Sequence, residues 1–138
     1  MIEVVPFERE HLDRLIDVPD QLGDLTPLGD QKSIAFTGLM NGTVIGCAGA
    51  FRLWPGVGEA WAAFSAMPPK QARACVFEVK RRLPGFMRDA GFHRLQASVL
   101  AEHINACRLA RAIGLEFEGF MKAYDSSKND YVRYGKVM

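Results

Sequence analysis

Runs of apolar residues, several of them alternating with polar ones, predict strands along much of the chain. Asn41-Gly42 separates two of these runs and tolerates the positive φ angles that a two-residue hairpin turn requires. A turn is also expected at Pro55–Gly58, so that three antiparallel strands follow one another. The expected strands are Met1–Val5, closed by Pro6, then Ser33–Met40, Thr43–Trp54, Glu59–Ala66, Arg94–Leu100, Leu115–Tyr124 and Tyr131–Val137.

A long helix is predicted after Pro68-Pro69, because proline suits the first turn of a helix. Its apolar residues recur every three or four positions and form one continuous face. Pro84-Gly85 interrupts this face and is expected to kink the helix or split off its last turns, and Gly91 ends it. The face consists of Ala72, Val76, Val79, Leu83, Phe86, Met87 and Ala90.

Two shorter helices are also expected. The first runs from Phe7 to Val18, where Leu12, Leu15 and Ile16 fall at helical spacing before Pro19, and residues 19–32 are expected to be a short helix or a loop. The second runs from about Glu102 to Ile113, with Ile104 and Leu109 facing inward and Gly114 as its C-terminal cap.

This order of elements indicates an α/β (mixed α+β) fold. Successive antiparallel strands, with helices between parallel neighbours, imply a central mixed, mostly antiparallel sheet that is covered by helices on both faces. The 138 residues, of which 49% are hydrophobic, are expected to form a single domain over residues 1–138.

Charge adds little to this picture at the level of the whole chain. There are 17 Lys and Arg residues against 16 Asp and Glu residues, whereas proteins that bind the nucleic-acid backbone usually carry a marked basic excess. Nucleic acid is therefore not an expected partner. The local basic cluster is interpreted either as a solvated helix face or as a small anion site, and it consists of Lys70, Arg73, Lys80, Arg81 and Arg82.

The cysteines indicate a reducing compartment and no metal. Cys47, Cys75 and Cys107 are widely spaced among apolar neighbours, lack metal-ligand spacing and are expected to be small buried hydrophobes. The first residues are acidic, with Glu3 and Glu8, and do not have the pattern of a signal peptide. No apolar run approaches the roughly 20 residues of a membrane helix. A cytoplasmic protein, without a membrane partner, is expected.

Several phrases of the sequence occur in the order that is typical of one superfamily. They are Val5-Pro6-Phe7-Glu8, Gly42–Gly49, Asn105–Leu109 with Gly114, and Phe117-Glu118-Gly119. In this order they resemble the GNAT superfamily of acyl-CoA-dependent N-acyltransferases, over nearly the whole chain. More narrowly, the length, the strand Glu59–Ala62 with its Trp61, and the helix that ends at Gly114 look like small phage and prophage GNAT-like proteins of the internal virion protein A family of short-tailed phages.

The resemblance implies a binding loop for the pyrophosphate of acetyl-CoA, the expected cofactor, at Met67–Ala72. Backbone N–H groups and a helix N-terminus favour an anion there, but the prolines remove donors and only Ala72 matches the family's pattern. Lys70, Gln71 and Arg73 are then the expected ligands beside Ala72. Either the basic side chains compensate for the missing glycines, or the loop no longer binds acetyl-CoA well.

The resemblance also implies that two neighbouring strands part to admit the pantetheine arm of acetyl-CoA. The arm would pair with the backbone at Phe64, Ser65 and Ala66, opposite the strand that carries Ala97 and Ser98. Main-chain groups would make these contacts, so the side chains neither support nor oppose them.

Proton handling is the third requirement, and the family's usual acid is missing. The tyrosine of its last helix corresponds to Ala110, which cannot donate a proton. Glu59 is the candidate base, acting through water, or else an exposed acid at a strand end. Ser98 could hydrogen-bond the leaving thiolate, or be an ordinary strand serine. Cys107 is either a substitute acid or a packed side chain.

Other side chains are interpreted mainly as structural. Tyr124, Tyr131 and Tyr134 either border an acceptor pocket or pack on strands. His11 and His93 are expected to pack or to lie on the surface, and His103 to cap a helix. Exposure of Trp54, beside Pro55-Gly56, would mark a partner surface.

These observations leave two functions open. The first is an acyl-CoA-dependent N-acetyltransferase that transfers the acetyl group directly from acetyl-CoA to an amine acceptor. The second is a catalytically inactive GNAT-like phage protein, virion-associated or acting as a binding module for a phage or host protein. A binder of CoA without chemistry lies between the two.

Overall fold

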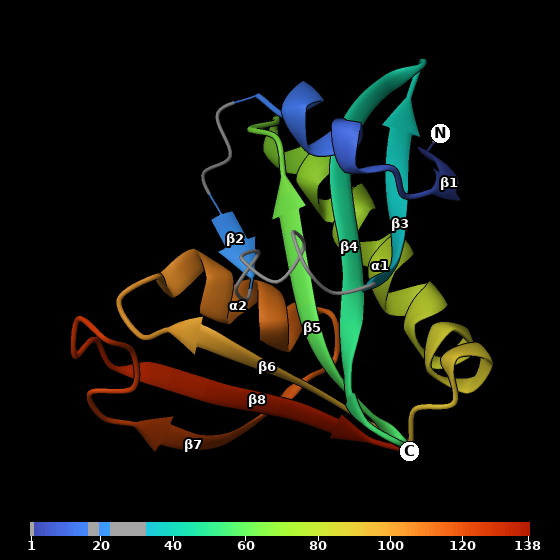
Figure 1. Cartoon of the computed structure of the whole chain (residues 1–138). Helices are drawn as coiled ribbons and strands as arrows, with labels where there is room; N and C mark the ends of the chain where they lie inside the picture. The colour runs from blue at the N-terminus through green and yellow to red at the C-terminus, as the bar shows by residue number, and fades with distance from the viewer. Residues whose placement is uncertain (1, 17–19, 23–32) are drawn as a thin grey trace.

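The computed structural model describes residues 2–16, 20–22 and 33–138 as a single sheet with two α-helices and a short 3₁₀ helix (Figure 1). The strands are β1 (Ile2–Pro6), β2 (Asp20–Leu22), β3 (Ser33–Met40), β4 (Thr43–Trp54), β5 (Val57–Phe64), β6 (Arg94–Leu100), β7 (Glu116–Met121) and β8 (Tyr131–Val137). The helices are η1 (Arg9–Arg14), α1 (Pro69–Ala90) and α2 (Ile104–Ala112).

The sheet is mixed and mostly antiparallel, as the sequence predicts. Its strand order is β1-β3-β4-β5-β6-β8-β7, with β2 paired to β5 beside this path. Among the described strands only β5 and β6 pair in parallel, because α1 carries the chain back between them, and the other pairs are antiparallel.

The β3–β4 hairpin confirms the prediction from Asn41-Gly42. The two residues have φ angles of 51° and 79°, in the left-handed region that a two-residue turn between twisted strands demands. The predicted bounds of β3 and β4 are also those of the structure, as are the bounds predicted for β6 and β8.

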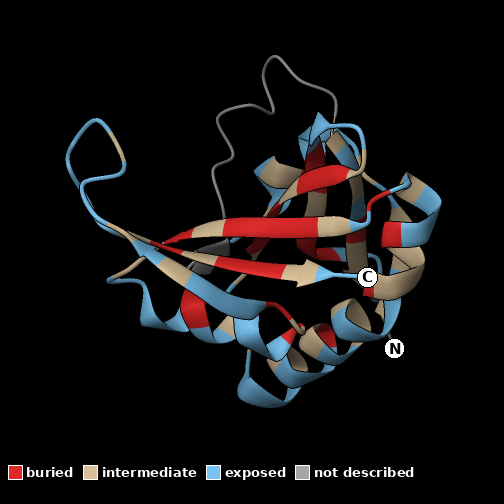
Figure 2. Ribbon diagram, turned by 90° about the horizontal axis from the view of Figure 1, so that it is seen from below, coloured by how far each residue is buried: buried red, intermediate tan, exposed pale blue. Residues whose placement is uncertain are grey.

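Helices cover both faces of the sheet. On one face, α1 and α2 pack on alternate residues of β5, β6 and β8, including Leu95 and Val132. On the other face, the segment around η1 places Phe7, Leu12 and Leu15 against Trp61. Figure 2 shows that the buried residues are concentrated in the strands and on the inner sides of the helices. No helix in the described part of the chain is long and apolar enough to cross a membrane.

The helix α1 is not split at Pro84, so of the two predicted effects of Pro84-Gly85 the split is wrong and the kink stays a prediction. It runs unbroken from Pro69 to Ala90, and Gly91 ends it with a φ of 75°. Leu83 and Met87 are both buried in the core on either side of Pro84, and this packing keeps the last turns helical. The predicted start and end of this helix are confirmed.

The predicted helix over Phe7–Val18 is wrong in type and length. Only Arg9–Arg14 is helical, as a 3₁₀ helix, and Leu15 is already extended. The i, i+3 spacing of Leu12 and Leu15 suits either helix, and contacts with the end of β5 draw the following backbone straight. The stop at Pro19 and most of residues 19–32 lie outside the described residues, although β2 within that range is a strand.

Smaller corrections concern the ends of elements. β5 begins at Val57 and ends at Phe64, so Gly58 belongs to the strand rather than to the turn. β7 ends at Met121, before the positive φ of Ala123. α2 begins at Ile104, which is exposed rather than inward, whereas Gly114 follows the helix with a φ of 106°, as expected of a glycine there.

Candidate active site

The parallel strands β5 and β6 pair over three residues and then part. Their register couples Val57 with Arg94 and ends at Glu59 with Gln96, and Figure 1 shows the two strands diverging beyond this point. The parting that the resemblance implies is therefore present. Glu59 is the last residue of β5 that pairs with β6, and it lies where the two strands begin to part.

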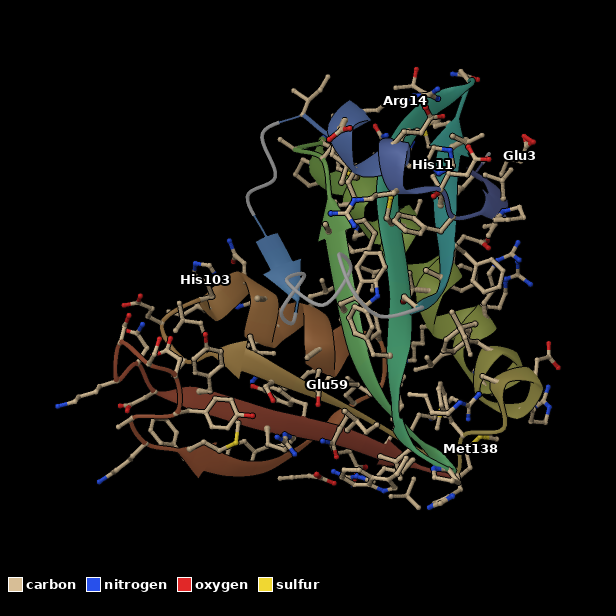
Figure 3. The ribbon with its side chains drawn as sticks, in the orientation of Figure 1. Glu3, His11, Arg14, Glu59, His103 and Met138 are labelled. Carbon is tan, nitrogen blue, oxygen red and sulfur yellow. The ribbon has the colours of Figure 1, made fainter. Side chains whose placement is uncertain are left out.

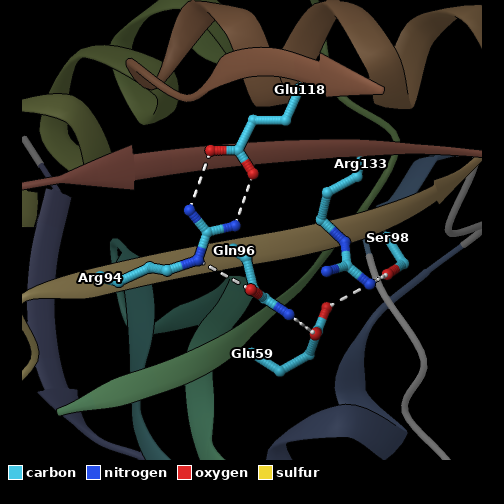
Figure 4. Close-up of polar contacts among 6 residues, drawn as sticks. All are labelled: Glu59, Arg94, Gln96, Ser98, Glu118 and Arg133. Atoms are coloured by element: carbon cyan, nitrogen blue, oxygen red, sulfur yellow. Dashed lines mark hydrogen bonds and ion pairs between the residues drawn. The ribbon is translucent and has the colours of Figure 1, made fainter. Parts of the chain in front are cut away.

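Glu59 lies at the centre of a polar network between β5, β6 and β8 (Figure 4). Its carboxylate accepts hydrogen bonds from Gln96 Nε2 at 3.1 Å and from Ser98 Oγ at 3.4 Å. Arg133 Nη2 donates to Ser98 Oγ at 3.2 Å, and Arg94 Nε donates to Gln96 Oε1 at 2.9 Å. The guanidinium groups of Arg94 and Arg133 are thus each connected to the Glu59 carboxylate by hydrogen bonds through one intermediate side chain.

Burial raises the pKa of Glu59 above its ordinary value. The hydrogen bond from Gln96, the charge of Arg133 and the hydrogen bonds from Ser98 oppose the effect of burial but do not cancel it. A carboxyl group with a raised pKa is a stronger base once it is ionised, which suits proton removal from an amine near neutral pH. The alternative interpretation, an exposed acid at a strand end, does not fit this half-buried and hydrogen-bonded carboxylate.

Arg94 is held by Glu118, which protrudes at a bulge of β7. Arg94 Nη1 lies 2.8 Å from Glu118 Oε2, and Nη2 bonds the other oxygen of the same carboxylate. This bidentate pair lowers the pKa of Glu118 and raises that of Arg94. Gly135 leaves room for it, because a Cβ atom at that residue would lie 2.6 Å from Glu118 Oε2.

Sequence reasoning missed most of this network, although a signal was present. Arg94, Gln96 and Ser98 alternate along one predicted strand and therefore share the face opposite α2. Three polar side chains in a row on one strand face are unusual for a buried sheet. Arg133 could not be found in this way, since only the pairing of β6 with β8 brings it opposite Ser98. Its Nε atom is buried and has no hydrogen-bond partner among the described residues.

The backbone positions predicted to pair with pantetheine are already paired within the chain. Phe64 lies opposite Asp20 of β2, a strand that the sequence did not predict. The Ala66 N–H donates to Ile16 O at 3.0 Å, and Ser65 Oγ accepts from the Ile16 N–H at 2.9 Å. The edge of β5 that faces the opening is therefore occupied.

The N-terminus of α1 follows the end of β5 directly. Pro69 has no N–H, and the Ala72 N–H donates to Pro68 O, so the N–H groups of Lys70 and Gln71 are those left to bind an anion. The first turn contains no acidic residue. Lys70 and Arg73 are exposed and make no ion pair with the described residues, which leaves their charges available to a phosphate.

Ala110 and Cys107 lie inside the molecule on the buried face of α2. Ala110 is completely buried, so the position at which the resemblance implies a tyrosine holds only core packing. Cys107 donates weakly to Leu100 O at 3.9 Å. Tyr134 packs on the same side, where its hydroxyl accepts a hydrogen bond from Arg111 Nη1 at 3.1 Å and burial raises its pKa.

The other two tyrosines lie at the far end of the β7–β8 hairpin. Tyr124 and Tyr131 pack on each other with ring centroids 5.2 Å apart, and the Tyr131 hydroxyl bonds Asp125. Tyr134 is on the α2 face, opposite the face of Glu59. Tyr134 packs in the core and Tyr124 packs on Tyr131, and a role of these residues at an acceptor pocket stays a prediction.

The histidines have structural or surface positions. His11 Nδ1 accepts from the Glu8 N–H at 3.1 Å and contacts Thr37 Oγ1 at 2.7 Å, which anchors η1 to the sheet. His103 is the N-cap residue of α2, although its side chain makes no capping hydrogen bond. Figure 3 shows that His11 and His103 lie well away from Glu59. His93 is exposed and packs against Gly56.

Two further features lie apart from Glu59. A cavity of about 480 Å³ separates α1 from β3, β4 and β5, and its walls are mostly apolar side chains and glycine backbone, including Gly46 and Phe64. Glu59 does not line it, because its side chain lies on the other face of the sheet. Trp54 is 58% exposed, so its proposed role at a partner surface stays a prediction.

Comparison with known sequences finds no matching family model and no matching curated protein. Comparison with solved structures finds many similar chains. An N-acetyltransferase from Staphylococcus aureus Mu50 superposes with a TM-score of 0.74 at 16% identity, over 99% of this chain and 97% of that one. The IAA acetyltransferase of Bacillus cereus ATCC 14579 superposes with a TM-score of 0.74 at 15% identity, over 100% and 99%.

A third similar structure contains a ligand. The microcin C7 self-immunity acetyltransferase MccE, solved in complex with acetyl-CoA and AMP, superposes with a TM-score of 0.66 at 9% identity, over 83% of this chain and 65% of that one. At such identities the similarity concerns the fold and not the activity. The parted parallel strands, the strand order and these superpositions together show that the chain has the fold of the GNAT N-acetyltransferases.

Proposed function

We propose that this chain is an acyl-CoA-dependent N-acetyltransferase that transfers the acetyl group directly from acetyl-CoA to an amine. The observation that carries the proposal is the position of Glu59. It lies where β5 and β6 part, it is half-buried, and its pKa is raised. A base at that point would be suited to deprotonate an amine that enters the opening from the face of Glu59.

Direct transfer of the acetyl group from a thioester to an amine needs one proton acceptor and one proton donor. When bound, acetyl-CoA supplies a thioester whose carbonyl carbon accepts the attack of a neutral amine. Glu59 takes the proton of the amine through water, the new C–N bond forms, and the C–S bond breaks. The leaving thiolate takes its proton from solvent, or is stabilised by a hydrogen bond from Ser98, because Ala110 offers no acid. Direct attack requires no covalent intermediate on the protein.

The first turn of α1 is the proposed site for the pyrophosphate. The N–H groups of Lys70 and Gln71 and the charges of Lys70 and Arg73 would bind it, beside Ala72, and the backbone of Phe64, Ser65 and Ala66 would hold the pantetheine arm. The missing N–H of Pro69 leaves fewer backbone donors than a glycine-rich loop offers, so the two basic side chains carry more of the binding.

Titration calorimetry with acetyl-CoA and with CoA tests this site. We expect the double variant Lys70→Ala/Arg73→Ala to bind at least about tenfold more weakly than the unmodified chain, since each lost charge-assisted hydrogen bond costs on that order. Lys80→Ala, farther along the same helix and also exposed, is the control and should bind as the unmodified chain does. Equal affinities for the double variant and the control would contradict the proposed site.

A second function rests on a different observation. Ala110 fills the core where an acid would be needed, and Pro68-Pro69 opens the loop. Both features suit a phage-type GNAT-like protein without catalysis, which would serve in virion assembly or as a binding module for a phage or host protein. Trp54, exposed at the end of β4 beside the exposed Leu53, is the proposed contact surface. Acetyl transfer to any amine in an acceptor screen would contradict this second function.

A further inference from the structure

We infer that β2 is an internal competitor of acetyl-CoA: it pairs with the edge of β5 that the pantetheine arm needs, so that binding requires β2 to leave. This inference rests on the proposed function, because it concerns the regulation of the same site. It is carried by the backbone of Asp20–Leu22, which lies antiparallel to Ala62–Phe64.

The alternation of β5 shows which of its edges is covered. The Ser65 N–H points to β4, where it donates to Ile45 O, whereas the Ala66 N–H points the other way, to Ile16 O. Successive backbone groups of a strand alternate between its two edges. The groups of Ala62 and Phe64 therefore lie on the edge away from β4, and that is the edge on which β2 pairs.

The same edge is the one that β6 leaves free. β5 pairs with β6 only as far as Glu59, three residues before Ala62. Beyond that point β2 takes the place of β6 beside β5, and it also lies close to α2 and β6. β2 is thus wedged in the opening between the parted strands rather than added at an outer edge of the sheet.

A peptide strand suits this position for a chemical reason. Pantetheine is itself a chain with amide groups, which can pair with an exposed strand edge as a peptide does. β2 and the proposed pantetheine segment, Phe64–Ala66, overlap at Phe64, whose N–H and C=O groups face β2, so only one of them can be bound there at a time. The apparent dissociation constant of CoA then equals the dissociation constant for the free edge divided by the fraction of molecules in which that edge is free.

A backbone substitution in β2 tests the competition. Leu22 lies opposite Ala62, so Leu22→Pro removes an N–H group that faces β5, whereas Leu22→Ala keeps it and changes only the side chain. We expect Leu22→Pro to bind CoA roughly fivefold or more tightly than the unmodified chain by calorimetry, about what one lost hydrogen bond gives. Leu22→Ala should bind as the unmodified chain does.

The outcomes separate the two proposals. Equal and measurable affinities for the unmodified chain and Leu22→Pro would overturn the competition and leave the proposed function standing. Weaker binding by Leu22→Pro would make β2 part of the binding site and would also overturn it. Absence of CoA binding at millimolar concentration in both proteins would overturn the proposed function and, with it, the competition.

A second measurement needs no variant and covers the case in which Leu22→Pro does not fold. Amide hydrogen exchange of the unmodified chain is followed with and without CoA at a saturating concentration. Displacement of β2 predicts faster exchange within Asp20–Leu22, while the Phe64 N–H, which the ligand then covers, stays protected. Unchanged or slower exchange of Asp20–Leu22 when CoA binds would overturn the inference.

Discussion

The pKa of Glu59 is set by its surroundings in the folded protein. A glutamate in water is a weak base near neutral pH, but burial beside Gln96 and Ser98 raises its pKa. The positive charge of Arg133, on β8, lowers the pKa of Glu59 and so opposes the effect of burial. The hydroxyl of Ser98 lies between the two groups and is hydrogen-bonded to both. The balance leaves the carboxyl group able to take and return a proton closer to neutrality than an exposed glutamate can.

The substitution Glu59→Gln should lower kcat/KM by about 10²–10⁴-fold, because it removes the proposed base and keeps the side-chain size. Only the ionised carboxylate accepts a proton, so the rate of the unmodified chain should fall as the pH drops through a pKa above the ordinary glutamate value. Glu59→Gln should lack this acidic limb. Thiol release from acetyl-CoA, measured against pH with the best acceptor amine, provides the readout.

A glutamate outside the network serves as the control for that experiment. Glu116, exposed on β7, should tolerate Glu116→Gln without a change in rate or in pH profile. A rate for Glu59→Gln equal to that of Glu116→Gln would show that Glu59 is not the base.

At the scale of elements, close contacts between strands decide which glycines the sheet needs. Gly49 on β4 faces Ala35 on β3, and a Cβ atom added there would lie 2.4 Å from Ile34 O and 2.7 Å from Ala35 Cα. These are backbone atoms, which cannot move without shifting the strand. Gly38 on β3 has more room, since its nearest neighbour would be Ile2 Cγ2 at 3.6 Å.

The variant Gly49→Ala should therefore lower the free energy of unfolding by about 1–3 kcal/mol, the usual cost of overpacking. Gly38→Ala is the matched control on the neighbouring strand and should stay within roughly 1 kcal/mol of the unmodified chain, because an alanine there makes ordinary contacts and restricts the unfolded chain. Urea unfolding followed by circular dichroism measures both values. Similar losses for the two variants would show that the contact at Ile34 O does not limit the strand.

At the scale of the whole molecule, the packing of α2 on the sheet determines what residue 110 can do. Ala110 is completely buried in the core that α1, α2 and the sheet share, and β2 lies close to the same helix. A tyrosine in the corresponding place would need space that this core does not leave. The small side chain of Ala110 is thus part of how the core is packed.

The variant Ala110→Tyr should for this reason lower the free energy of unfolding by at least about 1–3 kcal/mol and should not raise the rate of acetyl transfer. Ala112→Tyr, exposed on the same helix, should leave the thermal midpoint nearly unchanged. Differential scanning calorimetry and the acetyl-transfer assay give the two readouts. A faster reaction by Ala110→Tyr at an unchanged thermal midpoint would contradict this account.

Local patterns were enough for much of the fold. Asn41-Gly42 specified a hairpin, Arg94–Leu100 showed its strand by alternation, and Gly91 marked the end of α1. These signals work because turn chemistry and periodicity depend on neighbouring residues alone. The sequence also identified Glu59 as the candidate base and Ala110 as a residue that cannot donate a proton.

The tertiary structure decided what depends on residues far apart in the chain. The 3₁₀ form of Arg9–Arg14 and the unbroken α1 at Pro84 follow from packing against the sheet, which overrides local preference. The network around Glu59 joins β5, β6 and β8. β2 pairs with β5 although β3 and β4 lie between these two strands in the sequence. No local periodicity records such pairings, because their energy comes from burial and hydrogen bonds that exist only once distant strands meet.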